Sequence, residues 1–284
     1  MKEPSTTESM EFFPGGEGDL FGVTHLPEMP LNDVGYVFCH PLAEEKLWSH
    51  RVFVNFAREL AAGGSVALRF DHFGHGDSDG DFSGVSVDSM LNEIHHAKKH
   101  MIDKCSWVKR VVFLGLRMGA NNALGAARRY GADAVVAWEP ITDGGRYSQE
   151  ILRTNIAAQM ATFGEVRKNR EALVEDLRSG KHVNVEGYEI TLPLYVGIES
   201  ISLAESITAL GDTPLLIVNV NRSEKGTTSA YEKVVSESLN ADGIHRVDLR
   251  IAKEEPFWRE IRSFYQRADD LYRQTQSWLD ELVD

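Results

Sequence analysis

The sequence is poor in cysteine and has no long apolar run. Its two cysteines exclude a disulfide framework and lack the spacing of a metal site, so reduced thiols are expected. Cys39 ends an apolar run and is expected in the core, whereas Cys105 lies near a helix end. No window approaches the ~18 uncharged residues of a spanning helix. The first ten residues are polar and lack the apolar stretch of a signal peptide. A cytoplasmic protein without a membrane span is therefore predicted.

Clusters of basic residues are also absent. The net charge is −13, and Lys and Arg are scattered along the chain. Binding to nucleic acid needs a basic face that neutralises phosphates, so nucleic acid is excluded as a partner, and anionic membranes are an equally poor one. With 42% apolar and 26% charged residues over 284 positions, the chain is that of an ordinary globular protein with one large core.

Short β-branched or apolar runs alternate with longer amphipathic ones, which indicates the α/β class. An opening hairpin is predicted from 10–13 and 19–26. The further predicted strands are 34–40, 65–71, 110–115, 133–139, 214–220 and 246–252. Helices are predicted over 44–64 and 85–105, the latter capped by Ser86 or Asp88, and from about Phe257 to the end. This alternation predicts a mostly parallel eight-stranded sheet with helices on both faces.

The region 141–212 breaks the alternation with two helical patterns and a mixed segment. We interpret it as a helical cap inserted over the carboxyl edge of the sheet, where ligands of open α/β sheets bind. The predicted division is a core of 1–140 with 213–284, and a cap of 141–212. A continuation of the main sheet, drawn from 182–196, is the alternative.

The run "GLRMGA" (115–120) lies between a predicted strand and an Ala-rich helix. A Gly-x-x-x-Gly spacing at such a junction is typical of the nucleophile elbow, G-x-S-x-G. The central position holds Arg117 where Ser, Cys or Asp is expected. A guanidinium stays protonated and offers no usable lone pair, so Arg117 cannot act as the nucleophile.

Three further motifs accompany this elbow in a fixed order: "PLAEE" (41–45), "GHGDSDGDF" (74–82) and "PFW" (256–258). Together the four motifs resemble the α/β-hydrolase superfamily and, more narrowly, the hydrolase 2 group associated with the exosortase A system. The resemblance implies an α/β-hydrolase fold, an elbow in which Arg is a group trait, and a link to polysaccharide export. It also implies that the backbone N–H groups of Leu42 and Met118 would be the oxyanion-hole donors.

The remaining triad positions are also altered. In a hydrolase sheet the acid follows the strand at 214–220, where only Glu224 could serve. The base follows the strand at 246–252, but that slot holds 253–256, "KEEP", and no histidine occurs after His245. The positions Arg117, Glu224 and Glu255 thus form a degenerate triad, and a Ser-His-acid mechanism is excluded.

Arg117 at a helix N-terminus needs an acidic partner, because the helix dipole disfavours a cation there. Glu255, or its neighbour Glu254, is predicted to be that partner. One interpretation is a salt bridge that holds an inactive site together. The other is an anion receptor that uses Arg117 with the N–H groups of Leu42 and Met118. The predicted ligand-binding residues are Arg117, Met118, Leu42, His40, Glu255 and Trp258.

The histidines invite an interpretation as metal ligands. Glu93, His95, His96 and His100 share one predicted helix, but the polar surroundings "HHAKKH" favour a solvated outer face. His72 and His75 are expected to be turn residues bonded to backbone, with a role for one of them as proton donor to a ligand as the alternative. His40, at a strand end, is the one histidine retained for the site. The Asp-rich loop lacks the spacing of a calcium loop, and no nucleotide motif is present, so neither metal nor cofactor is expected.

The sequence leaves two functions open. The first is a non-hydrolytic ligand-binding or accessory protein for a small anionic or acyl ligand. The alternative is a hydrolase or acyl transferase that acts on an ester or acyl substrate, with His40 or Glu255 activating water in the former oxyanion hole.

Overall fold

The computed structural model describes residues 6–223, 229–239, 247–260 and 265–283. In these residues one sheet has eight strands in the order β1-β2-β4-β3-β5-β6-β9-β10. Their bounds are β1 Thr6–Pro14, β2 Asp19–Pro27, β3 Val34–Cys39, β4 Val66–Phe70, β5 Arg110–Leu116, β6 Ala134–Trp138, β9 Leu215–Asn221 and β10 Val247–Lys253. The strands β4, β3, β5, β6, β9 and β10 are parallel, whereas the β1–β2 hairpin is antiparallel. The predicted eight-stranded, mostly parallel sheet is confirmed.

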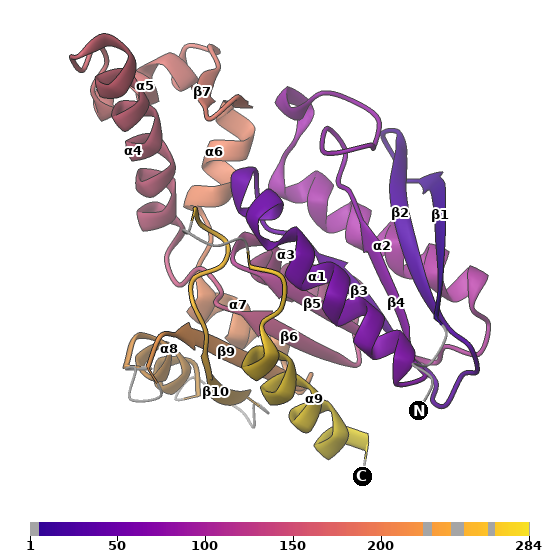
Figure 1. Ribbon diagram of the computed structural model, residues 1–284. Helices are drawn as coiled ribbons and strands as arrows, with labels where there is room; N and C mark the ends of the chain where they lie inside the picture. Colours follow the sequence, from indigo (N-terminus) through magenta and orange to yellow (C-terminus); the bar gives the residue numbers. More distant parts are fainter. Residues whose placement is uncertain (1–5, 224–228, 240–246, 261–264, 284) are drawn as a thin grey trace.

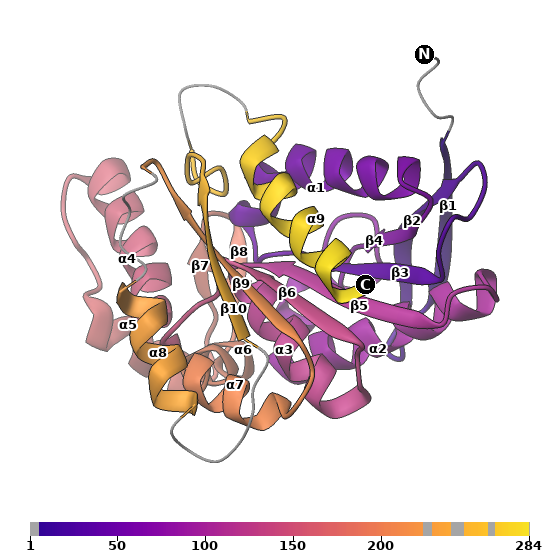
Figure 2. The ribbon, with the colours of Figure 1, turned by 90° about the horizontal axis from the view of Figure 1, so that it is seen from below.

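Helices cover both faces of this sheet, as Figure 2 shows. On one face α1 (Glu44–Ala62) and α9 (Asp269–Val283) pack over the inner strands and bury Phe53, Phe56 and Trp138. On the other face lie α2 (Val87–Lys104), α3 (Met118–Tyr130), α7 (Leu203–Leu210) and α8 (Ser229–Leu239). Strands that are buried on both faces explain the continuous apolar runs of the sequence. Ser86 caps α2 with a reciprocal capping box, as predicted from its position before the apolar pattern.

The segment between β6 and β9 adds no strand to the main sheet in the described residues. It contains α4 (Gly144–Phe163), α5 (Arg170–Arg178), a separate hairpin of β7 (Val183–Val185) and β8 (Tyr188–Ile190), and α6 (Leu192–Glu199). These elements rise together to one side of the sheet in Figure 1. The last helix of the segment, α7, packs instead against α3 and α8 on the sheet. Its side chains Leu203, Ile207 and Leu210 belong to that core.

The last helix differs from the prediction. It begins at Asp269, and Phe257 and Trp258 lie in a turn that follows β10. Phe257 and Trp258 are adjacent, and both side chains are buried. Adjacent residues of a surface helix do not both face the core, so this pattern is more typical of a turn at the sheet edge. The acidic first turn of α9 complements its dipole, and the Asp270 amide donates to Glu254 at 2.8 Å.

Candidate functional site

The elbow geometry is present at Arg117. Strand β5 ends at Leu116, α3 begins at Met118, and Arg117 between them has φ 53° and ψ −124°. A non-glycine residue with positive φ is strained and occurs where the surrounding structure enforces it. The close approach explains the two glycines: a Cβ on Gly115 would lie 2.3 Å from the Gly119 carbonyl oxygen, and one on Gly119 would lie 2.1 Å from that of Cys39.

The Arg117 side chain turns inward and is 11% exposed. Its Nε donates to Glu45 Oε1 at 3.1 Å, and its Nη2 lies 3.8 Å from Glu150 Oε2. Its guanidinium also lies over two aromatic rings, 5.3 Å from the centre of Tyr147 and 5.7 Å from that of Trp258. Arg117 is therefore already neutralised by carboxylates and enclosed by aromatic faces.

The predicted pairing of Arg117 with Glu255 or Glu254 is wrong. Glu255 instead pairs with Arg222 at 2.7 Å, and Glu254 accepts from the Tyr265 hydroxyl and from the Asp270 amide. The reason is that Glu45 reaches the elbow from the first turn of α1, directly after the β3 loop. Glu224 lies outside the described residues.

Burial and the neighbouring charges shift the pKa values of Arg117 and Glu45. Burial alone would lower the pKa of Arg117, but the Glu45 carboxylate and Tyr147 raise that pKa above its ordinary value. Burial raises the pKa of Glu45, against the effect of the Arg117 charge and of the Tyr147 hydroxyl, which donates to Glu45 Oε2 at 3.1 Å. Arg117 thus stays cationic at any physiological pH.

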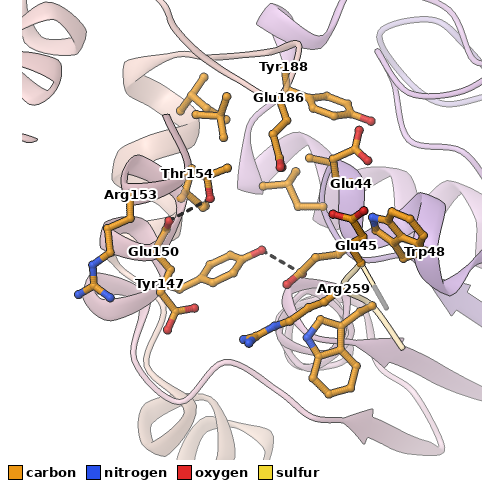
Figure 3. A pocket seen from close by; sticks show the side chains of 17 residues that line it. Glu44, Glu45, Trp48, Tyr147, Glu150, Arg153, Thr154, Glu186, Tyr188 and Arg259 are labelled. Carbon is orange, nitrogen blue, oxygen red and sulfur yellow. Dashed lines mark hydrogen bonds between the residues drawn. The ribbon is translucent and has the colours of Figure 1, made fainter. Parts of the chain in front are cut away.

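A pocket of about 680 Å³ opens beside this group, between the α1 start, α4, the β7–β8 hairpin and the turn after β10. We call it the central pocket. Its wall includes the acids Glu44, Glu45, Glu150, Glu186 and Glu260, the cations Arg153 and Arg259, and the aromatics Trp48, Tyr147, Tyr188 and Trp258. Figure 3 shows the Tyr147 hydroxyl hydrogen-bonded to the Glu45 carboxylate, with Glu44, Glu186 and Tyr188 at one end of the pocket. The wall combines aromatic faces with an excess of carboxylates.

Unused hydrogen-bond donors also border this pocket. Trp258 is 4% exposed, and its Nε1 has no hydrogen-bond partner in the described residues. The backbone amides of Leu42 and Met118 donate to no acceptor in the same residues. Leu42 lines the central pocket, whereas Met118 is buried in the cluster that joins the insertion to the core. A buried donor without a partner is costly, so Trp258 Nε1 and the Leu42 amide, which line the pocket, favour a ligand acceptor.

The family described as serine aminopeptidase S33 matches residues 37–194. The chain belongs to this α/β-hydrolase family. No curated protein matches it. Among solved structures it is similar to Est1E from Butyrivibrio proteoclasticus with bound ferulic acid, at 15% identity and a TM-score of 0.66, covering 96% of this chain and 99% of that one. It is also similar to an esterase from Pyrococcus furiosus, at 15% identity and a TM-score of 0.64, covering 99% and 92%. A thermostable carboxyl esterase from Bacillus coagulans gives 13% identity and a TM-score of 0.64, covering 99% and 100%.

These structural likenesses show the α/β-hydrolase fold of this S33 family member. None of the helices in the described residues combines the length and apolar character that crossing a bilayer demands.

Sequence reasoning missed Glu139 in this S33 family member. Glu139 follows β6 with φ 44° and is largely buried, which raises its pKa. Its carboxylate accepts from Asn219 Nδ2 at 3.0 Å and from the Val220 amide at 2.8 Å. Together with Arg117 and Tyr231 it lines a smaller cavity of about 290 Å³. The only sequence signal for Glu139 was its position at the end of a predicted strand, which places it at the carboxyl edge of the sheet.

The histidines are distributed differently from the prediction. His40 does not face the central pocket but lines a separate cavity with Lys46 and Arg69. Glu93 was expected on a solvated face. Instead it is buried, and its Oε2 lies 2.6 Å from His72 Nδ1, because this side of α2 packs on the Asp-rich loop.

The other histidines of α2 and of the Asp-rich loop are packed against neighbouring groups. His95 stacks on Tyr130, and His100 stacks on Phe13. His75 bonds to the Phe73 carbonyl oxygen as predicted. In the described residues no group of three metal-ligating side chains comes together.

Proposed function

We propose that this protein is a non-hydrolytic ligand-binding or accessory member of the S33 family. One observation carries the proposal: the elbow position holds a guanidinium whose Nε is bonded to Glu45 at 3.1 Å. An ion-paired arginine has no lone pair with which to attack an acyl carbon. The position of the catalytic base holds Glu255, and its carboxylate is paired with Arg222. This pairing supports the proposal that Glu255 does not act as a base.

We further propose that the ligand is uncharged and rich in hydroxyl or acyl oxygens. Five acids against two arginines in the wall disfavour the anionic ligand that the sequence suggested. Carboxylates accept hydrogen bonds from hydroxyl groups, and aromatic faces cover apolar surface of a ligand. Trp258 Nε1 and the Leu42 amide are available donors to a ligand oxygen.

The alternative is a hydrolase or acyl transferase in which His40 or Glu255 activates water. A general base must lie within hydrogen-bond reach of that water. His40 lines a different cavity from Leu42, and Glu255 is held by Arg222. In the described residues neither of these two candidate bases is placed to activate water beside Leu42.

The resemblance to the exosortase A-associated group supports the proposal of an accessory role in polysaccharide export, in the cytoplasm. A hydroxyl-rich ligand is compatible with that role. We also propose that α4, α5, the β7–β8 hairpin and α6 act as the cap over the central pocket, while α7 belongs structurally with the core, since it packs on α3 and α8.

The test is reaction of the full chain with a fluorophosphonate probe, read by intact mass, alongside hydrolysis of p-nitrophenyl esters. The proposal expects neither labelling nor ester turnover above heat-denatured protein. A serine esterase in the same assay is the positive control. Stoichiometric labelling of any single serine, or turnover that depends on native protein, would contradict the proposal.

A further inference from the structure

A second cavity lies apart from the central pocket. It has a volume of about 500 Å³ and is bounded by α1, the β1–β2 hairpin, the end of β4 and the Asp-rich loop. It shares no lining residue with the central pocket. We call it the α1 cavity. Its polar wall includes His40, Lys46, His50, Arg51, Arg58 and Arg69.

The wall of the α1 cavity contains a buried arginine, Arg69. The residue is 8% exposed and lines the α1 cavity. Its Nε donates to His25 Nε2 at 3.0 Å, and its two terminal nitrogens have no hydrogen-bond partner in the described residues. Burial lowers the pKa of Arg69 to about 10, so the side chain remains cationic at neutral pH. A buried cation without a bonded counter-charge is costly unless a ligand supplies one.

The acids in the cavity wall form no ion pair with Arg69, although the charges of Glu8 and Asp71 raise its pKa against the effect of burial. Within the described part of the chain no carboxylate lies within 4.0 Å of Arg69. Glu8 pairs with Arg58 at 2.6 Å, and Asp71 pairs with Lys46 at 2.6 Å. Glu8 and Asp71 are thus already engaged by other cations.

His40 provides a second, independent observation. It is 4% exposed, stacks on Phe53 with ring centres 4.8 Å apart, and lines the same cavity. Its Nδ1 has no hydrogen-bond partner in the described residues. A neutral imidazole carries one donor and one acceptor, so His40 is able to bond a ligand oxygen beside the arginine.

The α1 helix presents the cations Lys46 and Arg58 to the cavity, together with His50, whose pKa is lowered by burial. Lys46, His50 and Arg58 are four and eight positions apart, which places them on one helix face. Arg51, at the rim, is exposed and forms no ion pair in the described residues. The wall has four cationic side chains against three acids, in a chain with a net charge of −13. The wall thus has one cationic side chain more than it has acids, unlike the chain as a whole.

We propose that the α1 cavity is a second binding site, which takes the oxyanion of a small molecule, a phosphate or a carboxylate. The free Arg69 nitrogens would bind two of its oxygens, as guanidinium groups bind planar and tetrahedral oxyanions. His40 bonds a further oxygen, and Arg51 closes the rim. The cavity volume leaves room for an uncharged remainder of the ligand.

The test is calorimetric titration of the full chain at low salt with inorganic phosphate, pyrophosphate and citrate. The proposal expects one saturable site per chain that weakens with added salt. Preference for phosphate or pyrophosphate identifies a phosphate ligand, and preference for citrate identifies a carboxylate. Saturable binding by none of the three would overturn the proposal.

Variants locate the site. Arg69→Met should weaken binding by more than about tenfold, whereas Arg129→Met, an exposed arginine on α3, should leave it unchanged. If Arg69→Met does not fold, Arg51→Met at the exposed rim should still weaken binding by about threefold or more. Equal affinity in whichever of these two cavity variants folds would overturn the proposal. The central pocket variant Glu186→Gln should bind as the natural chain does, which separates this result from the proposed function.

Discussion

Arg117 Nε and Glu45 Oε1 lie 3.1 Å apart, although the two residues come from the starts of different helices. Arg117 precedes α3 at the elbow, and Glu45 lies in the first turn of α1, after β3. In a serine hydrolase these two loops supply the nucleophile and an oxyanion donor. Here they supply the two halves of an ion pair, and this pair compensates a cation that the α3 dipole disfavours.

The first prediction concerns this pair. Arg117→Met and Glu45→Gln should each lower the free energy of unfolding by about 3 kcal/mol, because each leaves a buried group without its partner. The double variant should lose clearly less than the two single losses added together. Urea unfolding of all four proteins measures the coupling.

The matched control is Arg129→Met, which breaks an exposed pair with Asp88. Exposed pairs contribute little to stability, so this variant should change the free energy of unfolding far less than Arg117→Met. If the losses of unfolding free energy for Arg117→Met and Glu45→Gln were strictly additive and no larger than that of the control, the ion pair would not stabilise the fold.

Most strands and helices of the fold could be predicted from the sequence, and the reason is physical. The strand residues are buried on both faces of a parallel sheet, so they appear as continuous apolar runs, and the order of strands and helices follows directly. The elbow was also readable, because Gly115 and Gly119 are needed where backbone approaches backbone. These features depend on local patterns.

The partners in the site were less accessible. Glu255 was predicted to pair with Arg117 from its place in the triad order, yet Glu45 has that contact. Both residues sit at the carboxyl edge, and which of them reaches the guanidinium depends on side-chain direction, which spacing does not encode. The buried contact of Glu93 with His72 was missed likewise, because a polar run of the α2 sequence masked one inward-facing acid.

A second prediction concerns the elbow backbone. Gly119→Ala should lower the free energy of unfolding by about 3 kcal/mol or more, because the new Cβ would lie 2.1 Å from the Cys39 carbonyl oxygen. Gly63→Ala is the control, since its Cβ would meet its nearest atom at an ordinary 3.4 Å. Thermal unfolding of both variants checks the difference, and equal melting temperatures would contradict the close packing of β3 and α3.

A third prediction concerns pH. Burial, with the nearby His72, lowers the pKa of His75 from 6.5 to about 4. As the pH falls, His75 is therefore protonated in the unfolded chain before it is protonated in the folded one. The stability of the folded chain is unaffected by this residue above pH 6.5 and decreases as the pH falls from 6.5 towards 4. At about pH 5 the loss should reach about 2 kcal/mol.

His75→Asn retains a donor for the Phe73 carbonyl oxygen and removes the titrating ring. Its free energy of unfolding should therefore fall less steeply over that range than that of the natural chain. His182→Asn, whose side chain is 45% exposed, is the surface control. Parallel pH profiles for the natural chain and His75→Asn would contradict the burial of a neutral His75.

The last prediction returns to the elbow. Arg117→Ser restores the residue type of a serine hydrolase at a position that keeps φ 53° and ψ −124°. It should nevertheless leave p-nitrophenyl ester hydrolysis within about twofold of the natural chain, because among the described residues no histidine lines the two cavities beside this position to take the serine proton. Glu45 and Tyr147 remain as neighbours, and neither is a neutral imidazole. Circular dichroism must show a folded variant, and a fluorophosphonate probe should leave the introduced serine unlabelled. A rise in turnover of about a hundredfold or more, with labelling at residue 117, would mean that this site retains a base.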